Sequence, residues 1–91
     1  MVIVTLQQVI DEKISFLKEQ INPNNKPELN STFQIQIDTI RSAAYDLENV
    51  ESIIKQKKAQ LKNSRDVYES DRLFAELDSL EWLQRQIARY S

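Results

Sequence analysis

The stretch FQIQIDTIRSAAYDLENVESIIKQKKAQL, residues 33–61, decides the fold. Its apolar side chains recur every seven residues, at Phe33, Ile40, Leu47, Ile54 and Leu61. A seven-residue apolar repeat marks one stripe of a helix that packs lengthwise on another helix. The repeat predicts a regular helix over about 29–62, roughly 50 Å long at 1.5 Å per residue.

The composition favours an all-α protein with a single domain over residues 1–91. The chain has 91 residues, of which 41% are hydrophobic and 29% charged, and it contains no glycine. Glycine supplies the positive-φ positions of tight β-hairpins and bulges, so its absence disfavours a β-rich fold. The two prolines, Pro23 and Pro27, lie close together and leave the rest of the chain unbroken.

Several kinds of chemistry are excluded by residue types that are missing. The chain has no cysteine and no histidine, which rules out thiol nucleophiles, disulfides, imidazole bases and Cys/His zinc sites. Without glycine, no glycine-rich phosphate loop is possible. We therefore expect no enzyme and no cofactor. The apolar run 2–6 is too short for a signal peptide or a membrane span, so we expect a soluble, cytoplasmic protein.

A first helix is predicted over about 5–21, followed by a linker over 22–28. Thr5 and Gln8 have the spacing of a capping box, in which each side chain satisfies a free backbone N–H of the first turn. Asn22-Pro23 ends this helix, because proline disfavours helical backbone angles in the residue before it.

A change of phase in the apolar pattern near Asn63-Ser64 predicts a turn, with a last helix over about 65–89. Antiparallel partners across a turn at 63–64 have residue numbers that sum to about 127. This register pairs apolar residues throughout, for example Ile54 with Leu73 and Val50 with Leu77. The expected fold is a three-helix bundle in which the short first helix packs on a long, coiled-coil-like hairpin.

One basic cluster lies at the end of the middle helix and consists of Lys55, Lys57, Lys58, Lys62 and Arg65. It could contact phosphates of DNA or RNA as a basic hairpin tip. The favoured interpretation is that it balances the helix dipole and pairs with acidic residues that follow in the sequence. A net charge of −2 gives no overall attraction to nucleic acid or to an anionic membrane.

The last helix is acidic and carries aromatic residues outside the predicted seam. Segment 66–81 contains six acidic residues and one arginine. These carboxylates could bind a divalent metal or mimic phosphates, although they are spread around a helix instead of converging. Surplus aromatic groups suggest a second contact surface, so we expect the chain to form a homodimer and to bind a partner protein. The candidate partner-binding residues are Trp82, Phe74, Tyr68, Glu69 and Glu76.

The sequence thus predicts a non-catalytic protein–protein interaction module that presents a rigid helical face to a larger protein complex. It would act as a small adaptor, assembly factor or inhibitor. The alternative is an accessory protein that binds nucleic acid through the basic hairpin tip.

Overall fold

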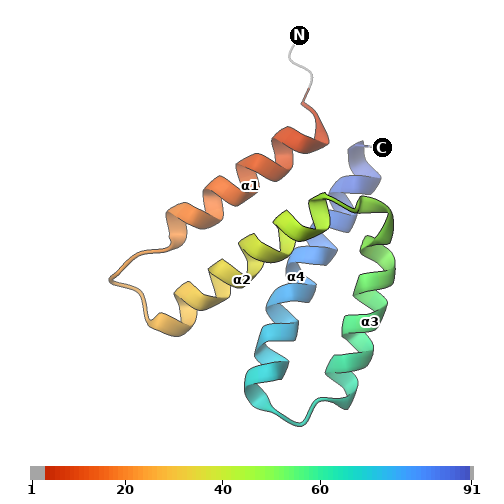
Figure 1. Ribbon diagram of the computed structural model, residues 1–91. Helices are drawn as coiled ribbons and strands as arrows, with labels where there is room; N and C mark the ends of the chain where they lie inside the picture. Colours follow the sequence, from red (N-terminus) through yellow and green to blue (C-terminus); the bar gives the residue numbers. More distant parts are fainter. Residues whose placement is uncertain (1–3, 91) are drawn as a thin grey trace.

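The computed structural model describes residues 4–90, which fold into four α-helices and one 3-10 turn without any strand. The prediction of an all-α protein is confirmed. The elements are α1 (Leu6–Gln20), α2 (Pro27–Ala44), η1 (Leu47–Asn49), α3 (Val50–Asn63) and α4 (Val67–Tyr90). Helix α4 is the centre of the arrangement, because α1, α2 and α3 all contact it (Figure 1).

The single helix predicted over 29–62 is wrong. Helix α2 ends at Ala44, and α3 begins only at Val50 after the 3-10 turn. Asp46 leaves the helical region, with φ −148° and ψ 64°, and its carboxylate accepts a hydrogen bond from Asn49 Nδ2 at 2.5 Å. The break redirects the chain, so that α2 crosses α4 while α3 runs beside it (Figure 1). Residues 29–62 therefore do not form one straight arm of a coiled-coil-like hairpin. Only α3 runs antiparallel to α4.

The seven-residue repeat survives the break because both halves pack against α4. Ile40 on α2 and Ile54 on α3 are 0% and 5% exposed, and each belongs to the same core as Leu80. A repeat of this kind reports that a stripe is buried, and it does not require the buried stripe to be straight.

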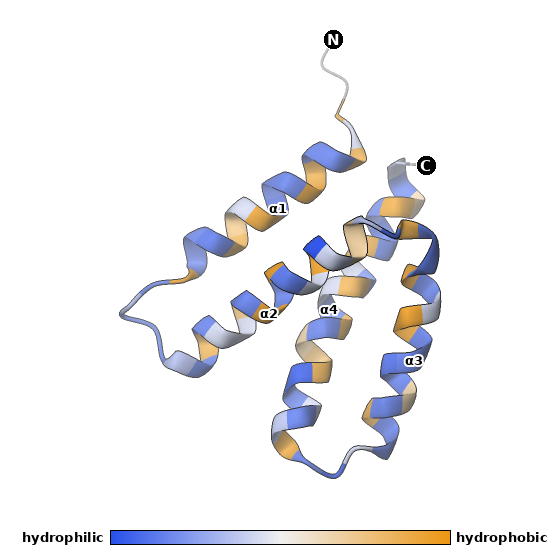
Figure 2. Ribbon diagram, viewed as in Figure 1, coloured by the Kyte–Doolittle hydropathy of each residue, from blue (hydrophilic) through white to orange (hydrophobic). Residues whose placement is uncertain are grey.

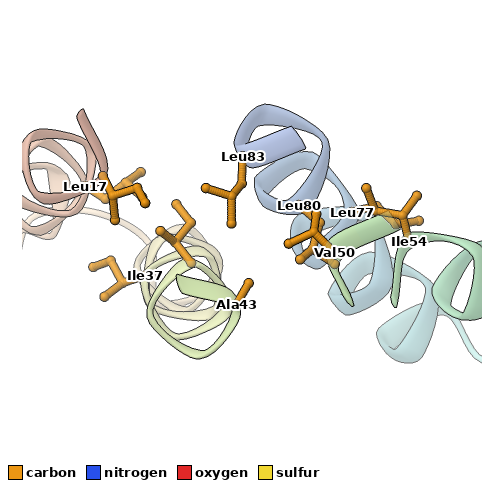
Figure 3. Close-up of a cluster of buried hydrophobic side chains, with 10 residues drawn as sticks. Leu17, Ile37, Ala43, Val50, Ile54, Leu77, Leu80 and Leu83 are labelled. Atoms are coloured by element: carbon orange, nitrogen blue, oxygen red, sulfur yellow. The ribbon is translucent and has the colours of Figure 1, made fainter. Parts of the chain in front are cut away.

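Helices α3 and α4 form the predicted antiparallel hairpin, in a shifted register. The turn spans residues 64–66 instead of 63–64, and Asp66 Oδ1 accepts the backbone N–H of Tyr68 at 2.9 Å. Val50, Ile54, Leu77 and Leu80 belong to one buried cluster (Figure 3). A turn centred on residue 65 pairs residues whose numbers sum to about 130 instead of about 127, so the register differs from the predicted one by about one helical turn.

Helix α1 begins as predicted. The Thr5 hydroxyl accepts the Gln8 backbone N–H at 3.2 Å, and Gln8 Oε1 accepts the Thr5 backbone N–H at 3.0 Å, which completes the capping box. The linker to α2 is fixed by amide hydrogen bonds around Asn30. Its side chain donates to the Asn22 carbonyl at 2.8 Å and accepts from the Asn22 N–H at 3.2 Å and from Asn25 Nδ2 at 3.0 Å. This clamp holds α1 beside α2 (Figure 1).

One hydrophobic core joins all four helices. Each helix is amphipathic, with hydrophobic and hydrophilic positions along its length (Figure 2). The buried cluster consists of Ile10, Leu17, Ile37, Ile40, Ala43, Val50, Ile54, Leu77, Leu80 and Leu83. No helix in the described part of the chain is both long enough and apolar enough to cross a membrane.

Candidate interaction surface

The five predicted partner-binding residues all lie on α4, but they do not share a face. Tyr68 lines a shallow depression beside α2, together with Thr32 and Ile35. Glu69 lines a different depression at the hairpin turn, with Arg65. At 100° per residue, Phe74 lies about 120° around the helix from Tyr68 and about 140° from Glu69, and it lines neither depression. The structure therefore separates these residues, although Tyr68 and Phe74 are 86% and 54% exposed.

Glu76 is occupied within the fold. Its carboxylate accepts a hydrogen bond from Lys57 Nζ of α3 at 2.5 Å and lies 3.3 Å from Arg72 Nε. The side chains of Glu76 and Lys57 retain only 15% and 22% of their exposure. Carboxylate oxygens bound to two cations are poorly available to an external partner, so Glu76 acts as a clamp between α3 and α4.

Trp82 is partly buried and packs against the hydrophobic core. Lys13 of α1 places its ammonium 5.3 Å from the Trp82 ring and 5.6 Å from the ring of Phe16, within the range of cation–π attraction. Helix α1 therefore covers part of Trp82. Phe16 remains 53% exposed beside it.

A regular stripe runs along one side of α4 and borders α1 and α2, because Asp71 lines the depression that contains Tyr68, and Asp78 and Trp82 line another with Lys13 and Gln36. It consists of Val67, Asp71, Phe74, Asp78 and Trp82, which are spaced by four, three, four and four residues. Such spacing places all five on one side of a helix. We call this set the outer stripe.

In the outer stripe, apolar and acidic side chains alternate. Val67 and Phe74 are 71% and 54% exposed, and Asp71 and Asp78 are also exposed. Neither aspartate has a cation within 4 Å among residues 4–90. Asp71, Asp78 and Val67 were not among the predicted site residues. Their spacing of four and three residues could have indicated this side of the helix from the sequence, because it differs from the seam that packs on α3.

The basic hairpin tip is largely paired with carboxylates. Lys57 pairs with Glu76, Lys58 lies 3.4 Å from Glu81 across the hairpin, and Lys55 lies 3.6 Å from Glu51 on its own helix. Lys62 and Arg65 are exposed and have no ion pair within the described residues. Most of the cluster is therefore paired within the chain, and Lys62 and Arg65 at the turn are the two cations without an ion pair among the described residues.

A cleft of about 280 Å³ lies between α2, α3 and α4. Its polar rim includes Thr39 and Ser42 on α2, and the Lys57–Glu76 pair lines one wall. The charges of this wall already neutralise one another. No side-chain polar atom that is buried in the described region lacks a hydrogen bond, and no group of three carboxylates there converges as a metal site requires. Asp38 also lines the cleft, where its carboxylate accepts a hydrogen bond from Gln34 at 2.9 Å. No group in the cleft identifies a particular ligand.

Comparisons with known proteins return no match: no protein-family model fits the sequence, and no curated protein and no solved structure is similar to it. The functional argument therefore depends on the geometry of the chain itself.

Proposed function

We propose that this chain is a non-catalytic protein–protein interaction module that binds its partner through the outer stripe of α4. The observation that supports the proposal is the row of exposed Val67 and Phe74, continued by Trp82, with unpaired Asp71 and Asp78 between them. Helices that dock into grooves use anchors spaced in this way. The remainder of the fold holds this helix rigid.

The chemistry of the stripe defines the partner. Large apolar side chains need pockets from which water is excluded, and aromatic anchors dominate the binding energy of such contacts. The two aspartates need basic groups on the rim of those pockets, which also speed association. The proposed partner is therefore a protein with an apolar groove bordered by lysine or arginine. Adaptor, assembly factor and inhibitor are the roles that fit this mode of binding.

A second copy of the chain is a poorer occupant of the same surface. In a two-fold interface each patch meets itself. Two outer stripes packed together would bring Asp71 and Asp78 of one copy close to the same aspartates of the other, and like charges at an interface are repulsive. The lack of cysteine is compatible with a reducing cytoplasm as the location of the complex.

Affinity capture from a lysate of the native host, with nuclease present, tests the proposal when matched variants are compared. Phe74→Ala should abolish recovery of the partner, since truncating an aromatic anchor costs about 2 kcal/mol or more. Tyr45→Ala is the control, because Tyr45 is 94% exposed and lies outside the stripe, in the break between α2 and α3.

A charge-reversed variant, Asp71→Lys with Asp78→Lys, tests the nature of the partner. Binding of the purified partner should weaken in this variant, and in the wild type it should weaken as salt increases. A partner that binds both stripe variants as tightly as the wild type would overturn the proposal. Recovery that is lost on nuclease treatment would instead support the basic hairpin tip.

A further inference from the structure

The break between α2 and α3 lacks the residues that normally end a helix. Residues 45–49 (YDLEN) contain neither proline nor glycine, and no residue from 4 to 90 has a positive φ. Val50 (φ −56°, ψ −45°) is helical and Tyr45 (φ −80°, ψ −12°) is close to helical, whereas Asp46 (φ −148°, ψ 64°) departs strongly and Asn49 (φ −96°, ψ 0°) departs less. Rotations at Asp46 and Asn49 would join the two helices.

The hydrogen bonds that hold the break closed are local. The Asp46–Asn49 side-chain bond is exposed, and the backbone contributes the Asn49 N–H to Asp46 carbonyl bond at 3.1 Å and the Asp46 N–H to Ala43 carbonyl bond at 3.0 Å. Leu47 adds packing, because it is partly buried against the core. Tyr45 is 94% exposed and therefore adds little packing. In a continuous helix, these residues would regain i to i−4 backbone bonds. The seven-residue repeat already runs through the break without losing phase.

Straightening would uncover the core of a single chain. Helix α4 has 24 residues and α3 has 14, so α4 extends about 15 Å beyond α3. If α2 continued along the axis of α3, only the last turns of α2 could still lie beside α4. Helix α1 and the start of α2 would move away from α4, which would divide the buried cluster to which all four helices contribute.

We infer that residues 45–49 form a hinge through which the chain exchanges its α3–α4 hairpin with a second copy of itself. Residues 27–63 then form one continuous helix in each chain. The α4 of one copy covers α1 and α2 of the other, and it makes the contacts that Leu80 and Leu83 make within one chain. Only an identical chain can restore these contacts, and exchange of this kind is a low-cost route to a dimer. The outer stripe takes no part in it.

Two variants move the equilibrium in opposite directions. Asp46→Ala with Asn49→Ala removes the side-chain hydrogen bond of the break and raises helix propensity, so the dimer dissociation constant should fall by roughly tenfold. Glu48→Pro should abolish the dimer. Glu48 lies in the 3-10 turn before α3, whereas within a continuous helix a proline removes a backbone bond and clashes with the preceding turn.

Size-exclusion chromatography with light scattering over a dilution series measures the dimer, and a pair of spin labels measures the hinge. Glu28→Cys and Lys62→Cys supply the label sites, because the chain has no other cysteine. In a continuous helix these positions are about 51 Å apart, and they are closer when the chain folds back. Labelled chains diluted into excess unlabelled chains report the distance within one chain.

The expected result is a dimer of the double-alanine variant with the long distance, and a monomer of Glu48→Pro with the short one. A double-alanine variant that stays monomeric would overturn the inference, whichever distance it shows. If the double-alanine variant loses helical circular dichroism, it is unfolded, and the oligomeric state of Glu48→Pro then tests whether the hinge is needed for the dimer. A wild-type dimer that persists unchanged in Glu48→Pro would then show that the hinge is not involved.

Discussion

Lys57 of α3 and Glu76 of α4 form a partly buried ion pair, with Nζ and Oε2 2.5 Å apart, and this pair lies where α2, α3 and α4 meet. A second cation, Arg72, approaches the other oxygen of the same carboxylate. The pair fixes α3 against α4 from one side of their seam. Lys58 and Glu81 form a more exposed pair across the same hairpin.

Glu76→Gln should lower the free energy of unfolding by about 1–3 kcal/mol, because it leaves two cations with a neutral partner in a partly buried position. Glu51→Gln is the matched control. Glu51 pairs with Lys55, and the two side chains are 70% and 76% exposed, so its loss should cost about 0–1 kcal/mol. Urea denaturation measures both. Equal losses in the two variants would mean that the Lys57–Glu76 pair adds nothing beyond a surface contact.

The same substitution at two leucines should give very different results. Leu83→Ala empties a fully buried position on α4 and should cost about 2–5 kcal/mol through lost transfer energy and a cavity. Leu29→Ala, in the first turns of α2 and 45% exposed, should cost under about 1 kcal/mol. Thermal and urea unfolding give the comparison. Comparable losses would mean that α4 is not the centre of the core.

The amide clamp around Asn30 should contribute to stability through the linker. Asn30→Ala removes its bonds to Asn22 and Asn25 and should lower the free energy of unfolding by about 1–2 kcal/mol. Asn24→Ala is the control, because only the backbone N–H of Asn24 makes a hydrogen bond in the described linker. Hydrogen exchange at the Asn22 amide should accelerate in the first variant alone. Unchanged exchange there would show that the clamp does not hold the linker.

Local signals in the sequence predicted the helix ends well. The Thr5–Gln8 capping box and the turn after Asn63 depend on neighbouring residues, and the structure contains both. The break at residues 45–49 could not be predicted in this way, since no proline, glycine or change of apolar phase marks it. It results from tertiary packing, in which α2 leaves the axis of α3 to join α1 and α4.

Only part of the candidate surface could be predicted, because exposure follows from local spacing whereas contacts depend on how distant helices pack. Exposure of Tyr68 and Phe74 followed from their positions outside the seam. The engagement of Glu76 by Lys57, and the cover that Lys13 gives Trp82, depend on where distant helices pack, which the local pattern does not determine. Asp71 and Asp78 were interpreted as part of a dispersed acidic surface. Only the orientation of α4 shows that they alternate with exposed apolar residues.

Nucleic acid should bind weakly to this chain, and only at low salt. Lys55, Lys57 and Lys58 of the hairpin tip already pair with carboxylates, so few cations are free to displace counterions from phosphates. Fluorescence anisotropy with labelled duplex DNA and single-stranded RNA, at low salt and at about 150 mM salt, measures this.

The informative variant is Lys62→Glu with Arg65→Glu, because both residues are exposed and neither is paired within the described chain. Lys57→Glu is unsuitable, since it would place two carboxylates together at Glu76. Tight binding at the higher salt that disappears in the Lys62/Arg65 variant would make the hairpin tip a nucleic-acid site and would count against the outer stripe as the main functional surface.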